Sequence, residues 1–280
     1  MKVPYAYKPV QFFLIAILLT WAAWLTAAYL SYQPGGGASG LIPALEIVGL
    51  FGPFLASLWM VFAAADKGLR RDYINRLLNL KLIKPSSFPV ILLVMPAAVV
   101  VAVWLSHLFF GRSLDQLSLA KASTFTAGIL PVPVMLFVPA LLEELGWKGY
   151  GVDSLRGQRT FFTATLIYAA LWACWHSPLF LINGYYHNLI LRANPLFALN
   201  FFVSVFPMTF IINWLWHKNK GSVLTAVLVH ASANCQGLLP LGQLAKGIET
   251  AVMVVMAIII VGLDRKTFFA KFPARIGDFG

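Results

Sequence analysis

The sequence predicts an all-α, polytopic integral membrane protein, and three observations lead to this fold class. Of its 280 residues, 60% are hydrophobic and only 11% are charged, whereas soluble domains usually contain about 25% charged residues. Apolar stretches of about 20 residues, the length at which a helix crosses a bilayer, recur along the whole chain. Lys and Arg are concentrated in alternate connections between these stretches. We therefore expect one integral membrane domain over residues 1–280, with about eight transmembrane helices.

The expected spans follow one another with short polar connections. The first apolar run begins after Lys2 and Lys8 and is longer than the apolar part of a secretory signal, so it is predicted to remain as an anchor. A Gly-rich turn, QPGGGASG, separates it from the second run. The spans are expected at residues 10–31, 41–65, 87–108, 124–147, 161–183, 195–216, 221–240 and 244–263.

The longest polar connection contains KGLRRDYINRLLNLKLIK, residues 67–84. Its apolar and basic residues are predicted to occupy opposite sides of a helix, an arrangement typical of helices that lie on a membrane surface. We therefore expect an amphipathic surface helix over about 67–84.

Membrane topology explains the net charge of +11. If the N-terminus lies inside, 17 Lys and Arg fall on the inner side and four on the outer side. Cytoplasmic loops of membrane proteins carry such an excess of Lys and Arg. The sequence thus predicts a multi-pass protein with both termini cytoplasmic, in the cytoplasmic membrane if the cell is prokaryotic. The partner of its basic residues is expected to be anionic lipid of the bilayer, with no role for nucleic acid.

Ionisable side chains inside a bilayer are costly, so each one needs an explanation. All the glutamates of the chain fall in or at the edge of an expected span: Glu46, Glu143, Glu144 and Glu249. The histidines divide into two within spans, His176 and His230, and three expected at the membrane interface, His107, His187 and His217. The two cysteines both lie in spans, so no disulfide framework is predicted.

Three short stretches on three different spans place polar groups at helical spacing. They are EELGWK with Glu144 and Lys148, WACWH with Trp172 and His176, and HASAN with His230 and Asn234. Residues four apart share one helix face, and an acid before a base at this spacing favours an ion pair. Glu143 is rotated by about 100° from Glu144, so the two carboxylates face different neighbours.

The expected topology brings these stretches together in the cytoplasmic half of the bundle. The fourth span ends at the inner side, and the fifth and seventh begin there. Pro139 in the fourth span and Pro178 after His176 are predicted to kink their helices. Such kinks open space for water, so we expect a catalytic cavity at this level.

The residue types in this cavity suit peptide hydrolysis. A carboxylate beside an imidazole can activate water as a general base, and a second histidine with an amide can stabilise an oxyanion. Neither a nucleophile elbow nor the zinc-protease sequence HExxH is present. Glu143, His176 and His230 are also a ligand set that could hold a divalent metal such as zinc, with one position open. Water activated by the carboxylate alone and water activated by a metal both remain open, so no cofactor is certain. The structural alternative is that each residue only packs or bonds between helices.

The three stretches, in this order, resemble the motifs EExxxR, FxxxH or WxxxH, and HxxxN of the CAAX-protease and bacteriocin-processing (CPBP) family of intramembrane endopeptidases. The resemblance covers about residues 120–240, and the expected span count is also similar to that of the family. It implies that Glu143 and His176 activate water and that His230 and Asn234 support the oxyanion. Lys148 stands where the family pattern has Arg, which keeps the charge but loses the two-pronged guanidinium. Glu144 is expected to pair with Lys148, and Trp172 to support the site.

Three functions are compatible with these observations. The first is an intramembrane endopeptidase that hydrolyses a peptide bond of a membrane-associated peptide or membrane-tethered protein. The second is a non-hydrolytic immunity or binding protein of the same family. The third is a proton-coupled transporter that uses Glu143, His176 and His230 as a proton relay. It is less favoured because the inverted repeats common in transporters are not visible. Glu46 in the second span is not explained by the protease interpretation; it either supports the residues of the site or is the best evidence for the transporter.

Overall fold

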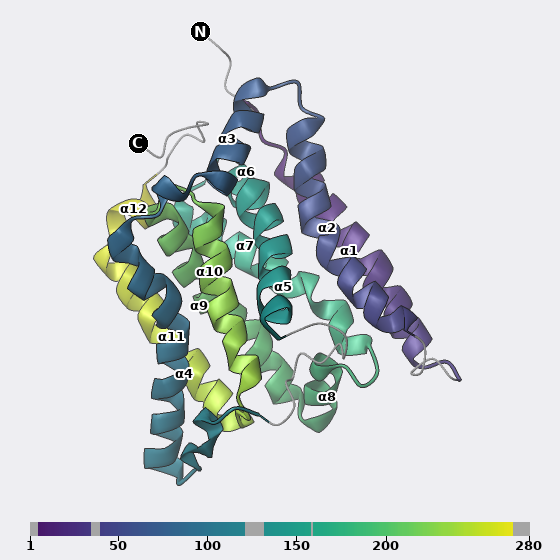
Figure 1. Ribbon diagram of the computed structural model, residues 1–280, viewed down its shortest axis with the longest axis vertical. Coiled ribbons are helices and arrows are strands. Elements are labelled where there is room, and N and C mark those ends of the chain that lie inside the picture. The colour runs from purple at the N-terminus through teal and green to yellow at the C-terminus, as the bar shows by residue number, and fades with distance from the viewer. Residues whose placement is uncertain (1–4, 35–39, 121–131, 158, 271–280) are drawn as a thin grey trace.

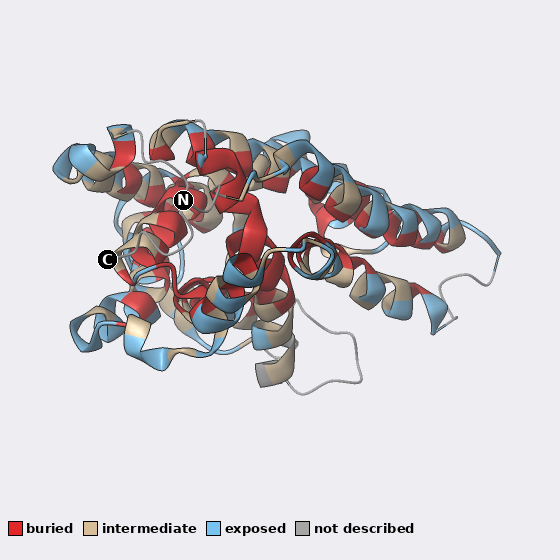
Figure 2. Ribbon diagram, turned by 90° about the horizontal axis from the view of Figure 1, so that it is seen from above, coloured by how far each residue is buried: buried red, intermediate tan, exposed pale blue. Residues whose placement is uncertain are grey.

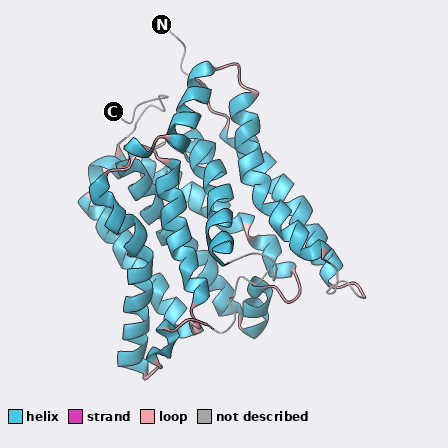
Figure 3. Cartoon of the chain, in the orientation of Figure 1, coloured by secondary structure: helices cyan, strands magenta, loops and turns pink. Residues whose placement is uncertain are grey.

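The computed structural model describes residues 5–34, 40–120, 132–157 and 159–270, and within these ranges the chain is helical without a β-strand (Figure 1, Figure 3). Six helices are long and apolar enough to cross a membrane by length and composition. They are α1 (Pro9–Ser31), α2 (Leu41–Phe62), α4 (Phe88–Phe110) with the 3₁₀ turn η3 (Pro85–Ser87) before it, α7 (Phe161–Trp175) with η6 (Ser177–Leu181) after it, α9 (Pro195–Lys218) and α11 (Gln243–Leu263). The all-α, multi-pass prediction is confirmed.

Two of the eight expected spans are shorter in the described chain. The helix α5 covers Val132–Gly146, and residues 124–131 of its expected span lie outside the described residues. The helix α10 covers Val223–Asn234 and continues only as the 3₁₀ turn η7 (Cys235–Leu238). Both lie inside the bundle between longer helices, α5 against α2 and α10 against α4 and α9 (Figure 1). These two shorter inner helices carry two of the three motifs.

The surface helix α3 (Lys67–Leu78) ends earlier than predicted and is followed by the 3₁₀ turn η2 (Leu80–Leu82). Asp66 caps it by accepting a hydrogen bond from the backbone of Leu69. One face, with Leu69, Tyr73 and Arg76, is buried against the protein. The buried Arg76 departs from the predicted pattern, because an arginine on a simple surface helix would point to water or to lipid headgroups.

Both ends of the described chain lie at the same end of the bundle (Figure 1). The ring of Tyr7 is 5.1 Å from that of Tyr150, in the turn after α5. The C-terminal helix α12 (Arg265–Phe269) stacks Phe268 on Phe161, at the start of α7, with ring centroids 5.4 Å apart. This arrangement agrees with termini on one side of a membrane; that this side is the cytoplasm stays a prediction.

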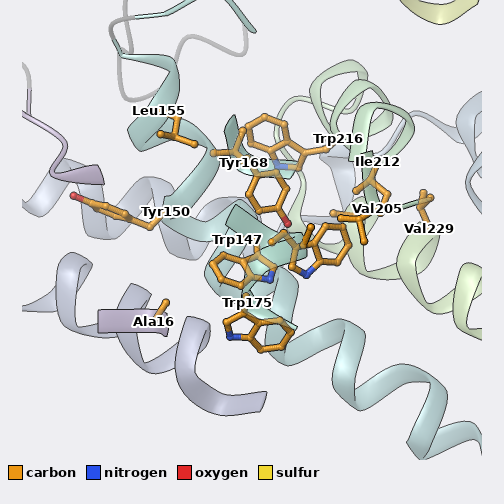
Figure 4. Close-up of a cluster of buried hydrophobic side chains, with 14 of the residues drawn as sticks. Ala16, Trp147, Tyr150, Leu155, Tyr168, Trp175, Val205, Ile212, Trp216 and Val229 are labelled. Atoms are coloured by element: carbon orange, nitrogen blue, oxygen red, sulfur yellow. The ribbon is translucent and has the colours of Figure 1, made fainter. Parts of the chain in front are cut away.

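Burial follows the pattern of a membrane protein. Buried residues are concentrated toward the middle of the bundle, and large apolar side chains such as Leu18, Trp59, Leu93 and Ile258 are exposed on its outer helices (Figure 2). A soluble surface does not expose so many large apolar groups together, whereas a lipid-facing surface does. The innermost residues include Trp147, whose ring contacts that of Tyr168 at 5.8 Å and that of Trp175 at 5.7 Å (Figure 4).

Close helix contacts hold α5 and α7 against the α1–α2 hairpin. Gly146, the last residue of α5, lies against the backbone of Pro53 in α2, and a Cβ there would collide with it. Trp175 Nε1 at the end of α7 donates to Thr20 Oγ1 of α1 at 2.7 Å. Thr20 in turn donates to the carbonyl oxygen of Gly49 in α2 at 2.7 Å. The C-terminal ends of α5 and α7 are therefore fixed relative to the α1–α2 hairpin.

Candidate active site

The end of α5 places Glu143 and Glu144 on different faces, as their spacing predicts. Both side chains are buried, with relative exposures of 4% and 0%. Directly after α5 the chain widens into a π-helical turn, η5 (Trp147–Gly151), before α6 (Val152–Arg156). Single π-helical turns inside α-helices are frequent at functional sites. This one begins where the first motif ends, and it sets the position of Lys148.

Glu144 bridges Lys148 and His230. Its Oε2 lies 3.1 Å from Lys148 Nζ, and its Oε1 lies 3.0 Å from His230 Nδ1. The Glu144 and Lys148 side chains are both completely buried. The predicted pairing of Glu144 with Lys148 is therefore present, and the same carboxylate also orients the histidine of the third motif.

Glu143 turns toward α7. Its Oε2 accepts a hydrogen bond of 2.8 Å from Trp172 Nε1, the aromatic residue of the second motif. The Trp172 ring also lies edge-on to His230, with centroids 5.3 Å apart, and 5.9 Å from the ring of His176. Trp172, predicted only as a supporting residue, is thus the side chain that brings the three motifs together.

The hydrogen bond of His176 determines which of its nitrogens is free. Its Nδ1 lies 2.8 Å from the carbonyl oxygen of Trp172. A carbonyl can only accept, so Nδ1 carries a proton, and in the neutral imidazole Nε2 then keeps its lone pair. His176 stands where α7 stops and η6 begins, one residue before Ser177 and two before Pro178. The predicted break at Pro178 is confirmed.

Asn234 makes a different contact from the one expected. Its Nδ2 donates to the carbonyl oxygen of Leu136 in α5 at 3.0 Å, so it joins the last residue of α10 to the helix of the glutamates. It lies one turn after His230 on α10, as the sequence spacing predicts. Its part in binding an oxyanion stays a prediction.

The possible metal ligands do not form a grouped set. Within the described ranges, no three side chains of His, Cys, Asp or Glu are arranged so that they could hold a metal ion. His230 Nδ1 bonds Glu144 and Glu143 Oε2 bonds Trp172, so His230 Nε2 and Glu143 Oε1 are the atoms that a metal would use. Metal binding by Glu143, His176 and His230 stays a prediction, and the chemistry below uses the side chains alone.

Sequence reasoning missed Tyr168. It lies one turn before Trp172 in α7 and stacks on it at 5.7 Å with an angle of 8° between the rings. Lys148 Nζ lies 4.4 Å from the centre of the Tyr168 ring, in a cation–π contact. The spacing could have revealed it, because Tyr168, Trp172 and His176 follow one another at intervals of four on one helix face.

Arg76 was also missed, and it ties α3 to the turn after Glu143 and Glu144. Arg76 is 2% exposed; its guanidinium contacts Asp72 at 2.8 Å and Asp153 at 2.7 Å. It also donates to the carbonyl oxygens of Lys148 and Gly149, both at 3.2 Å. Burial alone would lower the pKa of Arg76, but Asp153 and Asp72 outweigh it and raise the pKa above the usual value. The backbone of η5 is therefore anchored by a permanently charged group from a distant segment.

Comparison with known proteins gives two matches. A protein-family model described as type II CAAX prenyl endopeptidase Rce1-like matches residues 122–236, a range that contains all three motifs. A curated protein, CAAX prenyl protease 2 of Methanococcus maripaludis, is 37% identical over 268 residues. The alignment covers 95% of this chain and 98% of that protein.

Proposed function

The chain belongs to the Rce1-like family of type II CAAX prenyl endopeptidases, and we propose that it is an intramembrane endopeptidase in which Glu143 and His176 activate water. The substrate is a membrane-associated peptide or protein, as expected for a membrane protein of a protease family. The observation that carries the proposal is the arrangement around Trp172, which holds the Glu143 carboxylate by its indole and His176 by its carbonyl.

In the proposed first step, a water molecule lies between Glu143 and His176. Both offer acceptors, a carboxylate oxygen and the unprotonated Nε2, and either can take a water proton. The Glu143 oxygen not bonded to Trp172 is the general base. The water oxygen forms a bond to the carbonyl carbon of the substrate as the proton moves to Glu143. The carbonyl π electrons move to oxygen and give a tetrahedral oxyanion.

His230 and Asn234 stabilise the oxyanion in this proposal. With Glu144 accepting from Nδ1, the charged imidazolium form of His230 is favoured and its Nε2–H is free to donate. Lys148 neutralises Glu144 from the other side and keeps it turned toward His230. In the second step, Glu143 returns the proton to the leaving nitrogen, the C–N bond breaks, and a carboxylic acid and an amine are released.

The test is cleavage of fluorogenic peptides by the purified protein in detergent. The relative's name, CAAX prenyl protease 2, makes prenylated and unprenylated CAAX peptides the first two sets to compare. We expect cleavage by the wild type and a loss of at least about 1,000-fold in kcat for Glu143→Gln, which keeps the shape but removes the base.

Glu249→Gln is the matched control, because it removes another buried carboxylate, in α11 and outside the motifs. It should cleave like the wild type. Each protein is assayed with and without a chelator; loss of activity on chelation, restored by zinc, would instead support the metal ligand set. Peptide binding without cleavage by the wild type would contradict the proposal and support the binding-protein alternative.

A further inference from the structure

His187 lies beside the proposed catalytic pair, although its sequence position predicted a residue at the membrane interface. It is the second residue of the short helix α8 (Tyr186–Ala193) and is only 9% exposed. Its ring is 6.2 Å from that of His176 with an angle of 21° between the planes. The Phe201 ring of α9 lies edge-on to both imidazoles, at 4.4 Å from His187 and 5.2 Å from His176.

Both ring nitrogens of His187 are buried without a hydrogen-bond partner among the described residues. Its surroundings are aromatic: besides Phe201, it contacts Phe180 edge-on at 5.0 Å and stacks on Tyr185 at 5.5 Å. Burial lowers the pKa of His187 well below its usual value, and the charges of His176 and Lys246 lower it further. A neutral imidazole offers one N–H donor and one acceptor. Leaving both unsatisfied is costly, so such a group in a native protein calls for a partner.

Tyr185, two residues before His187, belongs to the same aromatic surroundings and stacks on the His187 ring. Burial raises the pKa of the Tyr185 hydroxyl, and the carboxylates of Glu46 and Glu143 raise it further. The negative charge of Glu143 is therefore felt in the segment that carries His187.

We propose that His187 is a substrate-binding residue, whose protonated ring nitrogen donates to a main-chain carbonyl oxygen of the substrate and whose other nitrogen accepts from a main-chain N–H, next to the scissile bond. The substrate main chain offers both kinds of group, and because the two ring nitrogens point apart they bond two different peptide groups. The His187 ring is 6.2 Å from that of His176, so a peptide bound at His176 lies close to it, and the surrounding aromatic rings keep water away from the two bonds. The inference rests on the proposed function of the same site, but it concerns binding and can be measured without cleavage.

The test uses Glu143→Gln as the background, so that the peptide is not consumed. A fluorescent peptide that binds this variant is selected from the CAAX peptides of the cleavage assay, and its Kd is measured by fluorescence anisotropy in detergent. Adding His187→Phe, which keeps a ring but removes both nitrogens, should raise Kd by about tenfold or more. Adding His187→Gln, which keeps a donor and an acceptor, should recover part of the affinity.

Peptides with a single backbone amide replaced by an ester locate the contact. At one position, the ester should weaken binding to the Glu143→Gln variant that keeps His187. The same ester should have little further effect on Kd when His187→Phe is added, because the effects of changing two direct partners are not additive. His107→Phe is the control, because His107 is exposed and lies in α4; its Kd should not change. An unchanged Kd in His187→Phe, or a loss that couples to no backbone position, would overturn the inference. A wild type that binds but never cleaves would overturn the proposed function and leave this result standing.

Discussion

At the scale of single residues, Trp172 shows how the motifs act together. Its indole N–H holds Glu143, its carbonyl sets the tautomer of His176, and its ring lies edge-on to His230. Only the first of these contacts depends on the indole nitrogen. A substitution that removes the indole nitrogen but keeps an aromatic ring therefore tests the orientation of the Glu143 carboxylate separately from ring packing.

Trp172→Phe should lower kcat by about 10- to 100-fold with little change in KM, because a hydrogen bond to a charged carboxylate is lost while the stacked ring remains. Steady-state kinetics with the peptide that the wild type cleaves best measure kcat and KM. Trp214→Phe is the control, since Trp214 Nε1 also donates to a carboxylate, that of Asp264 at 3.0 Å, outside the three motifs. A large KM effect in Trp172→Phe, with kcat intact, would contradict the orienting role.

Lys148→Met should leave Glu144 as a buried charge without its ammonium partner. Removing one member of a buried ion pair typically costs about 3–5 kcal/mol, so we expect a lower unfolding temperature in detergent and little cleavage. Lys148→Arg keeps the charge and should recover much of both. The exposed Lys81→Met serves as the control for loss of a positive charge. Equal stability of Lys148→Met and the wild type would show that the pair does not hold this helix end.

At this scale the sequence predicted contacts within one helix better than contacts between helices. The spacing of Glu144 and Lys148 predicted their pairing, because four residues make about one turn. The same rule could not show that Glu144 also reaches His230, 86 positions away. The burial of His187 was not predicted for the same reason, since it depends on Phe201 and Phe180 from other segments.

At the scale of elements, the connection between α3 and η5 is the feature that sequence patterns did not indicate. The separation of apolar and basic residues over 67–84 is typical of a helix on lipid, and it predicted the helix but not its buried face. Arg76 pairs with Asp72 of α3 and with Asp153 of α6, and it donates to two carbonyl oxygens of η5, the turn that follows Glu143 and Glu144. The π-helical geometry leaves those carbonyls available to an outside donor.

Arg76→Met should lower the unfolding free energy by about 3–5 kcal/mol, because it leaves the partly buried Asp72 without this partner and Asp153 with only the longer pair to Arg156 at 3.7 Å. Thermal unfolding in detergent measures the stability, and peptide cleavage at a temperature where the variant is folded measures the site. We expect kcat to fall while folded, because η5 and Lys148 lose their anchor. The exposed Arg71→Met should match the wild type. A normal kcat in folded Arg76→Met would show that Arg76 contributes to stability but does not position the site.

The helices themselves were predicted closely where they are long and apolar. Length and hydropathy identified all six long helices, since these face lipid and must be apolar throughout. The two inner helices are bounded by their contacts with neighbours. The sequence therefore overestimated α10, whose helix stops at Asn234, where that side chain bonds to α5.

At the scale of the whole molecule, alternation of the spans agrees with the predicted topology. Both ends of the described chain and the α3–η5 connection lie at one end of the bundle (Figure 1). The bias in Lys and Arg predicts that this end faces the cytoplasm. The depth of the site, its cavity and this orientation remain predictions.

Cysteine labelling in sealed vesicles tests the orientation. Cys174 and Cys235 are free and exposed, so both are first replaced by alanine. In right-side-out vesicles, Lys81→Cys, near α3, should react with a membrane-impermeant maleimide only after the vesicles are permeabilised. Arg112→Cys, beyond the other end of α4, should react from outside. The reverse pattern would invert the topology and place the site toward the opposite leaflet.

The Arg76–Asp153 pair also constrains how the protein is made. Arg76 leaves the ribosome 77 residues before its partner, so the nascent chain carries that cation through the insertion of at least one further helix with only Asp72 to accompany it. Docking of α3 must then wait until α6 has been synthesised. The end of the bundle that holds Glu143 and Glu144 therefore cannot close on a ribosome-bound chain that stops short of Asp153.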